Sequence, residues 1–211
     1  MKPEVRFLSR EIRVEGDSTA PKIKGYASVF NSLSEDLGGF REQIASDAFD
    51  ACLASNCDCR ALFNHDPNMV LGRTTAGTLK LTADSTGLAY EIDPPDTQVA
   101  RDLMTSMKRG DIDQSSFGFY CLDDTWDLDT ETNALIRTVR KATVFDVSPV
   151  TYPAYTATSS GIRNQRDLFP EGVIELPPEA LALRNTEPPA EPSATGESDD
   201  DLALVLMALQ Q

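Results

Sequence analysis

The stretch TLKLTADSTGLAYEI, residues 78 to 92, contains two runs in which apolar and polar residues alternate. Alternation with a period of two is typical of strands that bury one face, because successive side chains point to opposite sides. The residues between the runs, Asp84 to Gly87, favour a tight turn. The stretch therefore predicts a β-hairpin and, with it, an antiparallel sheet.

Strand-like runs recur through the first 160 residues of the chain. They are VRFLSREIRVE (5–15), KIKGYASVF (22–30), CRALFN (59–64), SSFGFYCL (115–122) and ALIRTVRKATVFDVSPV (134–150). Two stretches, ASDAFDACLAS (45–55) and TQVARDLMTSMKRG (97–110), instead space their apolar residues as helices do. We predict a mainly β fold with flanking helices, in which about seven mostly antiparallel strands close into a barrel and so remove the sheet edges.

The net charge of −15 limits the partners of the protein. Such a surface repels phosphate backbones and anionic membrane surfaces, so neither nucleic acid nor a membrane is an expected partner. No apolar run approaches the roughly 20 residues that cross a bilayer, and the start MKPEVRFLSREIRVEGD does not resemble a secretion signal. A cytosolic protein is expected.

The composition changes after about residue 162. From Arg166 to Gln211 there are ten acidic residues, two arginines and six of the 13 prolines. We predict a folded domain over residues 1–162 and an acidic, Pro-rich, disordered tail over 163–211. Within the tail, DDDLALVLMALQQ (199–211) favours a short apolar C-terminal helix, which either binds a partner or folds back on the domain.

The four cysteines, Cys52, Cys57, Cys59 and Cys121, show no framework spacing, and we expect them to be thiols. Cys57, Cys59 and His65 are conceivable soft-metal ligands, but one C-x-C without a second cysteine pair is not a zinc-site pattern. Neither a metal nor a cofactor is expected.

Ser116 is a candidate nucleophile. On a strand it shares a face with Gly118 and Tyr120, and the small glycine leaves room for a substrate or another backbone. The structural alternative is a serine that only satisfies the backbone before a core strand.

Asp146 lies in VFDVSPV, within an otherwise apolar strand, where alternation places it with Val144 and Ser148 on one face. A buried carboxylate needs a partner. That partner is either an imidazole N–H or an arginine of the preceding IRTVRK, and the residues alone favour neither.

His65, in LFNHDPNMVLGR (62–73), is the sole histidine. A serine hydroxyl becomes a good nucleophile when a base takes its proton, and imidazole is the usual base near neutral pH. Asp146 is the best candidate to orient the ring, and Asp66 is the second. A histidine that only packs or lies on the surface is the alternative.

Five motifs occur in an order that resembles the prohead proteases of tailed bacteriophages, the capsid maturation proteases related in fold to the herpesvirus assemblins. They are GYASVFN (25–31), LFNHDPNMVLGR, GTLKLTADSTGLAYEID (77–93), RGDIDQSSFGF (109–119) and FDVSPVTYPAY (145–155). The resemblance covers roughly residues 5–160. It implies a herpesvirus-protease-like β-barrel and a serine endopeptidase, with Ser116 as nucleophile, His65 as general base and Asp146 orienting the histidine. In many relatives a glutamate stands at the position of Asp146, so the carboxylate arm of this chain would be one methylene shorter.

The resemblance also implies the substrates: scaffolding protein, or a scaffold-like segment of the major capsid protein, cut within the assembling prohead in the host cytoplasm, with self-cleavage and possible self-association. Two other classes of function remain. One is a non-catalytic capsid assembly module on the same barrel, and the other is an esterase, although the G-x-S-x-G elbow of an α/β-hydrolase is missing.

Overall fold

The computed structural model describes residues 2–8, 12–16, 20–152 and 176–184. The strands are β1 (Glu4–Leu8), β2 (Arg13–Glu15), β3 (Lys22–Val29), β4 (Phe40–Ile44), β5 (Arg60–Phe63), β6 (Asp66–Arg73), β7 (Leu79–Ala83), β8 (Gly87–Ile92), β9 (Gln114–Asp129) and β10 (Ala134–Val150). The helices are α1 (Asp50–Ala54), α2 (Gln98–Arg109), α4 (Pro178–Arg184) and the 3-10 helix η1 (Thr74–Ala76). None of these helices is long and apolar enough to cross a membrane.

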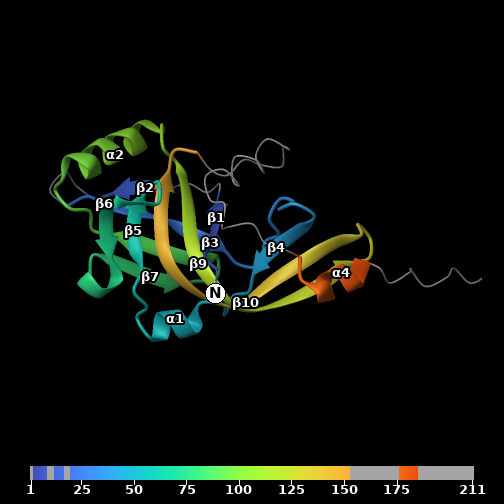
Figure 1. The fold of residues 1–211 in the computed structure, drawn as a ribbon. Helices are drawn as coiled ribbons and strands as arrows, with labels where there is room; N and C mark the ends of the chain where they lie inside the picture. The colour runs from blue at the N-terminus through green and yellow to red at the C-terminus, as the bar shows by residue number, and fades with distance from the viewer. Residues whose placement is uncertain (1, 9–11, 17–19, 153–175, 185–211) are drawn as a thin grey trace, which may run out of the picture.

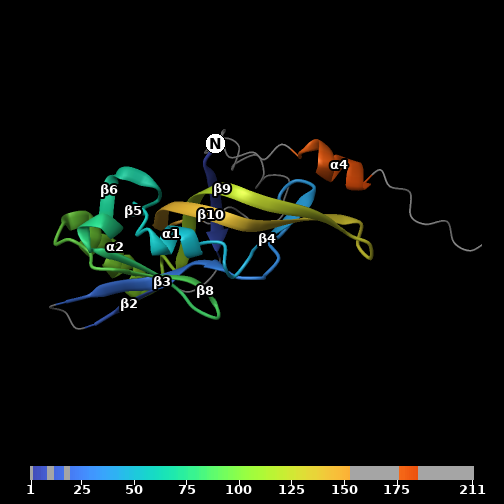
Figure 2. The same cartoon turned by 90° about the horizontal axis from the view of Figure 1, so that it is seen from below.

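The strands form two sheets, which lie as two layers in Figures 1 and 2. The first sheet has the order β1-β9-β10-β5-β6, with β4 also paired to β10, and the second has the order β2-β3-β8-β7. The fold is mainly β, as predicted, but the predicted closed barrel is wrong, because the first sheet is an open half-barrel. Among the described residues no ladder joins its edge strands β1 and β6 to β2 or β7, and β10 pairs in parallel with both β4 and β5.

The predicted hairpin over 78–92 is present as β7 and β8, paired antiparallel. Its turn is fixed by Asp84, whose side chain accepts hydrogen bonds from the backbone amides of Thr86 and Gly87. The predicted helix over 97–110 is also present, as α2. Thr97 caps its first turn, and Gly110 ends it with a φ of 82° that favours glycine.

The main core lies between the two sheets. The first sheet contributes Phe117, Phe119 and Val144, and the second contributes residues such as Ile23 and Leu88. One face of α2, with Leu103 and Met107 among its buried residues, closes this core at one end (Figure 1). The central strands β9 and β10 are therefore fixed on their inner face, and the opposite face of β9 near Ser116 is left for the site.

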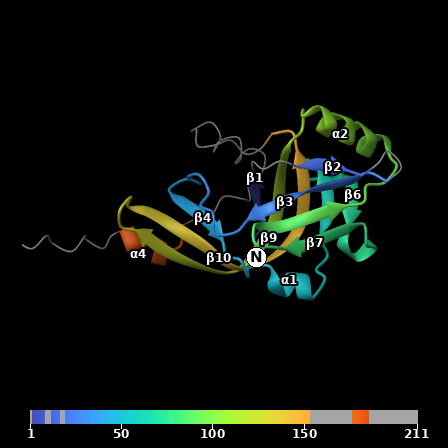
Figure 3. The ribbon, with the colours of Figure 1, turned by 180° about the vertical axis from the view of Figure 1, so that it is seen from behind.

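The distal parts of β9 and β10 extend away from the second sheet as an arm, which also carries β4 and α4 (Figures 1 and 3). A second, smaller core forms there from Phe40, Leu135 and Ala180, with Trp126, Leu128, Leu176 and Leu183 packed against it. Helix α4 lies within the segment predicted to be a disordered tail and was not expected from the sequence. The remainder of 163–211, including the predicted C-terminal helix, lies outside the described residues, so the domain boundary near residue 162 stays a prediction.

A buried ion cluster joins β1 and β4 to the arm. Arg6 binds Glu42 (Nε to Oε1, 2.7 Å), and Arg137 binds Glu4 (Nη1 to Oε2, 2.6 Å) and Glu42 (Nη1 to Oε2, 2.9 Å). Burial by itself raises the pKa of Glu42, but the charges and hydrogen bonds of the two arginines outweigh it and hold the pKa below its ordinary value. The Glu42 carboxylate therefore remains ionised inside the protein.

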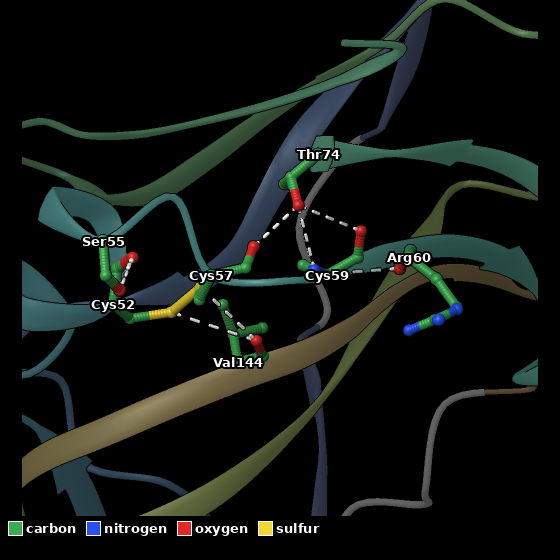
Figure 4. Close-up of a disulfide and its surroundings, with 7 residues drawn as sticks. All are labelled: Cys52, Ser55, Cys57, Cys59, Arg60, Thr74 and Val144. Atoms are coloured by element: carbon green, nitrogen blue, oxygen red, sulfur yellow. Dashed lines mark hydrogen bonds between the residues drawn. A yellow bond between two sulfur atoms is a disulfide. The ribbon is translucent and has the colours of Figure 1, made fainter. Parts of the chain in front are cut away.

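The cysteines differ from the prediction of four thiols. Cys52 and Cys57 form a disulfide, with Cα atoms 5.1 Å apart, while Cys59 and Cys121 are free (Figure 4). The turn after α1 brings the first two residues within the distance that a disulfide spans. Both sulfur atoms lie near the Val144 carbonyl oxygen, at 3.9 and 3.7 Å, and these are packing contacts because a disulfide carries no S–H. The bond links α1 to the segment that leads into β5.

Candidate active site

Strand β9 presents Ser116. Its neighbours Ser115 and Phe117 face the core, where the Ser115 hydroxyl and the Tyr90 hydroxyl hydrogen-bond at 3.0 Å. Ser116 faces the other way and is fully buried. Its Oγ lies 2.8 Å from the carbonyl oxygen of Arg6 on the adjoining strand β1.

Strand β10 presents Asp146 through a β-bulge. The register with β9 shifts between Val144 and Asp146, so that Val144 pairs with Phe119 and Asp146 pairs with Gly118. Val144 and Val147 both face the main core, which simple alternation does not allow. The predicted common face of Val144 and Asp146 is therefore wrong, because the extra residue, Phe145, reverses the alternation at this point.

His65 is presented by the turn between β5 and β6. Asn64 and His65 adopt left-handed backbone conformations, with φ of 54° and 59°. The turn is bound to the end of β10, because the Asn64 amide donates to the Pro149 carbonyl (3.0 Å) and the Asn64 side chain accepts from the Thr151 amide (2.9 Å). These bonds hold the imidazole against the strand that carries Asp146.

The structure brings together the three residues selected from the sequence. His65 Nε2 lies 2.5 Å from Ser116 Oγ, and His65 Nδ1 hydrogen-bonds Asp146 Oδ2. The side chains of His65 and Asp146 are each only 7% exposed, so water does not screen their interaction. This chain of hydrogen bonds can move a proton from the hydroxyl to the ring while the carboxylate stabilises the resulting imidazolium.

The alternative partners lie elsewhere. Asp66 accepts hydrogen bonds from the amide and the side chain of Asn68. Arg137, from the IRTVRK run, binds the buried ion cluster and Asp124 rather than Asp146. Of the conceivable metal ligands, Cys57 is in the disulfide, and burial, reinforced by the charge of Asp146, raises the pKa of the Cys59 thiol.

A family model described as caudovirus prohead serine protease matches residues 8–168. The chain belongs to this family. It is therefore a serine protease of phage capsid maturation, and the part matched includes all three residues of the site. No curated protein sequence matches the chain.

The solved structures similar to this prohead protease include the bacteriophage T4 capsid assembly protease, gp21. The identity is 8% and the TM-score is 0.47, over 71% of this chain and 99% of the phage T4 chain.

Two residues of the site were not selected from the sequence. Asn64 fixes the turn of His65, and Ser148 donates a hydrogen bond to Asp146 Oδ1 (2.7 Å). Alternation along the strand places Ser148 on the same face as Asp146. The sequence does not show, however, that the serine hydroxyl binds this carboxylate.

Proposed function

We propose that this prohead protease is an endopeptidase that uses a Ser-His-Asp triad of Ser116, His65 and Asp146. The observation that carries the proposal is the imidazole of His65, which has one nitrogen on the serine hydroxyl and the other on a carboxylate. The same arrangement on unrelated folds performs acyl transfer.

In the proposed mechanism Ser116 Oγ attacks the scissile carbonyl carbon while His65 Nε2 accepts the hydroxyl proton. Asp146 accepts the Nδ1–H hydrogen bond, which keeps the ring in one tautomer and stabilises the imidazolium. His65 then returns the proton to the leaving amine. A water molecule then attacks the acyl carbon while His65 accepts its proton. His65 returns this proton to Ser116 Oγ as the acyl group leaves.

The proposed substrates are the scaffolding protein or a scaffold-like segment of the major capsid protein, together with the protease chain itself, cut inside the assembling prohead. The family supports capsid proteins as the general class. We propose the acidic, Pro-rich sequence after residue 162, outside helix α4, as the region of self-cleavage.

The test is co-expression of the full chain with the neighbouring capsid or scaffold protein, followed by mass spectrometry of the products. Ser116→Ala and His65→Ala should each lower cleavage by roughly a millionfold, to an undetectable level. Ser115→Ala is the matched control, because this serine is equally buried on the same strand but faces the core. Normal processing by Ser116→Ala would refute the triad and favour a non-catalytic assembly module.

A further inference from the structure

Ser148 lies beside the proposed triad without belonging to it. It is fully buried on β10 and is the register partner of Ser116 on β9. Its hydroxyl donates to Asp146 Oδ1 at 2.7 Å. The two hydroxyls therefore lie on neighbouring strands, one at each end of the Asp146–His65 pair.

The Asp146 carboxylate has two oxygens with different partners. Oδ2 bonds His65 Nδ1, and Oδ1 bonds Ser148 Oγ. Two hydrogen bonds on opposite oxygens fix the rotation of the carboxylate about its Cβ–Cγ bond. With only one of them the group can turn, because that terminal torsion is broad.

No solvent replaces the hydroxyl if it is lost. Asp146 is 5% exposed and Ser148 is 0% exposed, so water does not readily reach Oδ1. A buried, ionised oxygen without a donor is costly, and the carboxylate turns toward any donor within reach. The donor already bound to the carboxylate is the Nδ1–H of His65, so the imidazole ring moves when the carboxylate turns. His65 Nε2 then no longer points at Ser116 Oγ.

We propose that Ser148 is a positioning residue, which holds the Asp146 carboxylate in the orientation that aligns His65 with Ser116. The inference rests on the proposed triad. In this role Ser148 acts through the Asp146 carboxylate, to which its hydroxyl donates.

The test compares Ser148→Ala, Ser148→Thr and Ser115→Ala in the full chain, on a peptide that spans the cut site mapped by mass spectrometry. Loss of a hydrogen bond to a charged group is expected to lower kcat about 10- to 100-fold and to leave KM unchanged. Threonine keeps the hydroxyl and should restore most of kcat. Ser115→Ala removes a buried hydroxyl from the other face and should keep the wild-type rate.

A second readout does not need activity. His65 is the sole histidine, so its Nδ1–H gives one downfield proton resonance without overlap. Ser148→Ala should shift and broaden this resonance, whereas Ser148→Thr and Ser115→Ala should leave it near its wild-type position. If threonine is too large for the buried site and unfolds the chain, the alanine spectrum still decides.

Two results overturn the inference: wild-type kcat in Ser148→Ala, or an unchanged His65 resonance in that variant. A failure of the proposed triad gives a different result from a failure of the Ser148 proposal. If the triad is wrong, Ser116→Ala still cleaves the substrate, whatever the His65 resonance shows.

Discussion

Gly118 controls how closely the Phe145 ring approaches strand β9. A Cβ at residue 118 would lie 2.6 Å from Phe145 Cζ and 2.7 Å from Cε2, which is closer than van der Waals contact permits. The Phe145 ring also packs against Tyr120, with centroids 4.8 Å apart. Only glycine at residue 118 leaves room for the ring against β9, at the bulge next to Asp146.

Gly118→Ala should destabilise the fold by about 1–2 kcal/mol, because the methyl group forces the ring outward. The measurement is chemical denaturation of a double-mutant cycle with Phe145→Ala. In the Phe145→Ala background the clash is gone, so Gly118→Ala should become neutral or slightly stabilising. Additive effects of the two substitutions would contradict the proposed contact.

At the scale of single residues, the sequence offered Ser116, His65 and Asp146 as candidates, and the resemblance to the prohead proteases favoured them over their structural alternatives. It placed Asp146 on the wrong face relative to Val144, because a bulge depends on how two strands pair and not on local composition. The role of Ser148 depends on the same pairing.

At the scale of elements, the packing of α4 on the arm can be followed by tryptophan fluorescence. Trp126 is the sole tryptophan and packs in the small core with Phe40 and Ala180. Ala180 on α4 is fully buried, whereas the next residue, Leu181, is 45% exposed. The helix therefore shields the indole with one face only.

Ala180→Asp should release α4 from the arm, because a carboxylate at this buried position has no partner among the described residues of the small core. Trp126, which is partly buried in the wild type, then becomes more exposed to water, and its fluorescence emission shifts to the red. Leu181→Asp is the matched control and should leave the emission unchanged. Equal spectra for wild type and Ala180→Asp would show that α4 does not cover the indole.

The disulfide should stabilise the protein modestly. It closes a loop between residues only five apart in sequence, which in the chain-entropy model is worth roughly 2 kcal/mol. Dithiothreitol should lower the free energy of unfolding of the wild type by about this amount. A variant carrying Cys52→Ser and Cys57→Ser should not respond to the reductant, whereas Cys121→Ser should respond as the wild type does.

The hairpin over 78–92 and helix α2 were predicted correctly because their signals are local: alternation, turn residues, a cap and a terminal glycine. Helix α4 was missed because it is short and its apolar residues gain their partners only from the distant arm. The disulfide was missed for a related reason, since the approach of its two cysteines follows from the turn after α1.

At the scale of the whole molecule, the buried ion cluster fixes β1 and β4 to the two long strands. Glu42 has a lowered pKa in the folded chain, and in the unfolded chain a glutamate titrates near about 4.3. Its ion pairs therefore contribute fully above about pH 4.3 and are lost as the pH falls below that value toward the folded pKa.

Glu42→Gln should destabilise the protein at pH 7 by about 3–5 kcal/mol, because it leaves Arg6 and Arg137 short of a buried partner. The difference from wild type should shrink as the pH is lowered from 5 to 3, which thermal denaturation at each pH would measure. Glu91→Gln is the control, since Glu91 binds Lys22 and Lys24 on a largely solvated face. A difference that does not change with pH would contradict the account.

The overall architecture was the part least determined by the sequence. The strand runs predicted a mainly β fold but not its division into two sheets, because alternation shows which face of a strand is buried and not which strands are neighbours. The parallel pairing of β10 with β4 and β5 arises from crossovers between segments about 90 residues apart, for which the sequence has no local signal.

The full burial of Ser116 between His65 and the backbone of Arg6 has a kinetic consequence. A fluorophosphonate phosphonylates Ser116 Oγ, with loss of fluoride, only when the backbone at Arg6 moves away and exposes this oxygen. As the reagent concentration increases, the observed first-order rate constant of labelling should reach a plateau equal to the rate constant of this opening. The plateau would give the rate at which the protease alone exposes Ser116 Oγ, before any capsid protein is present.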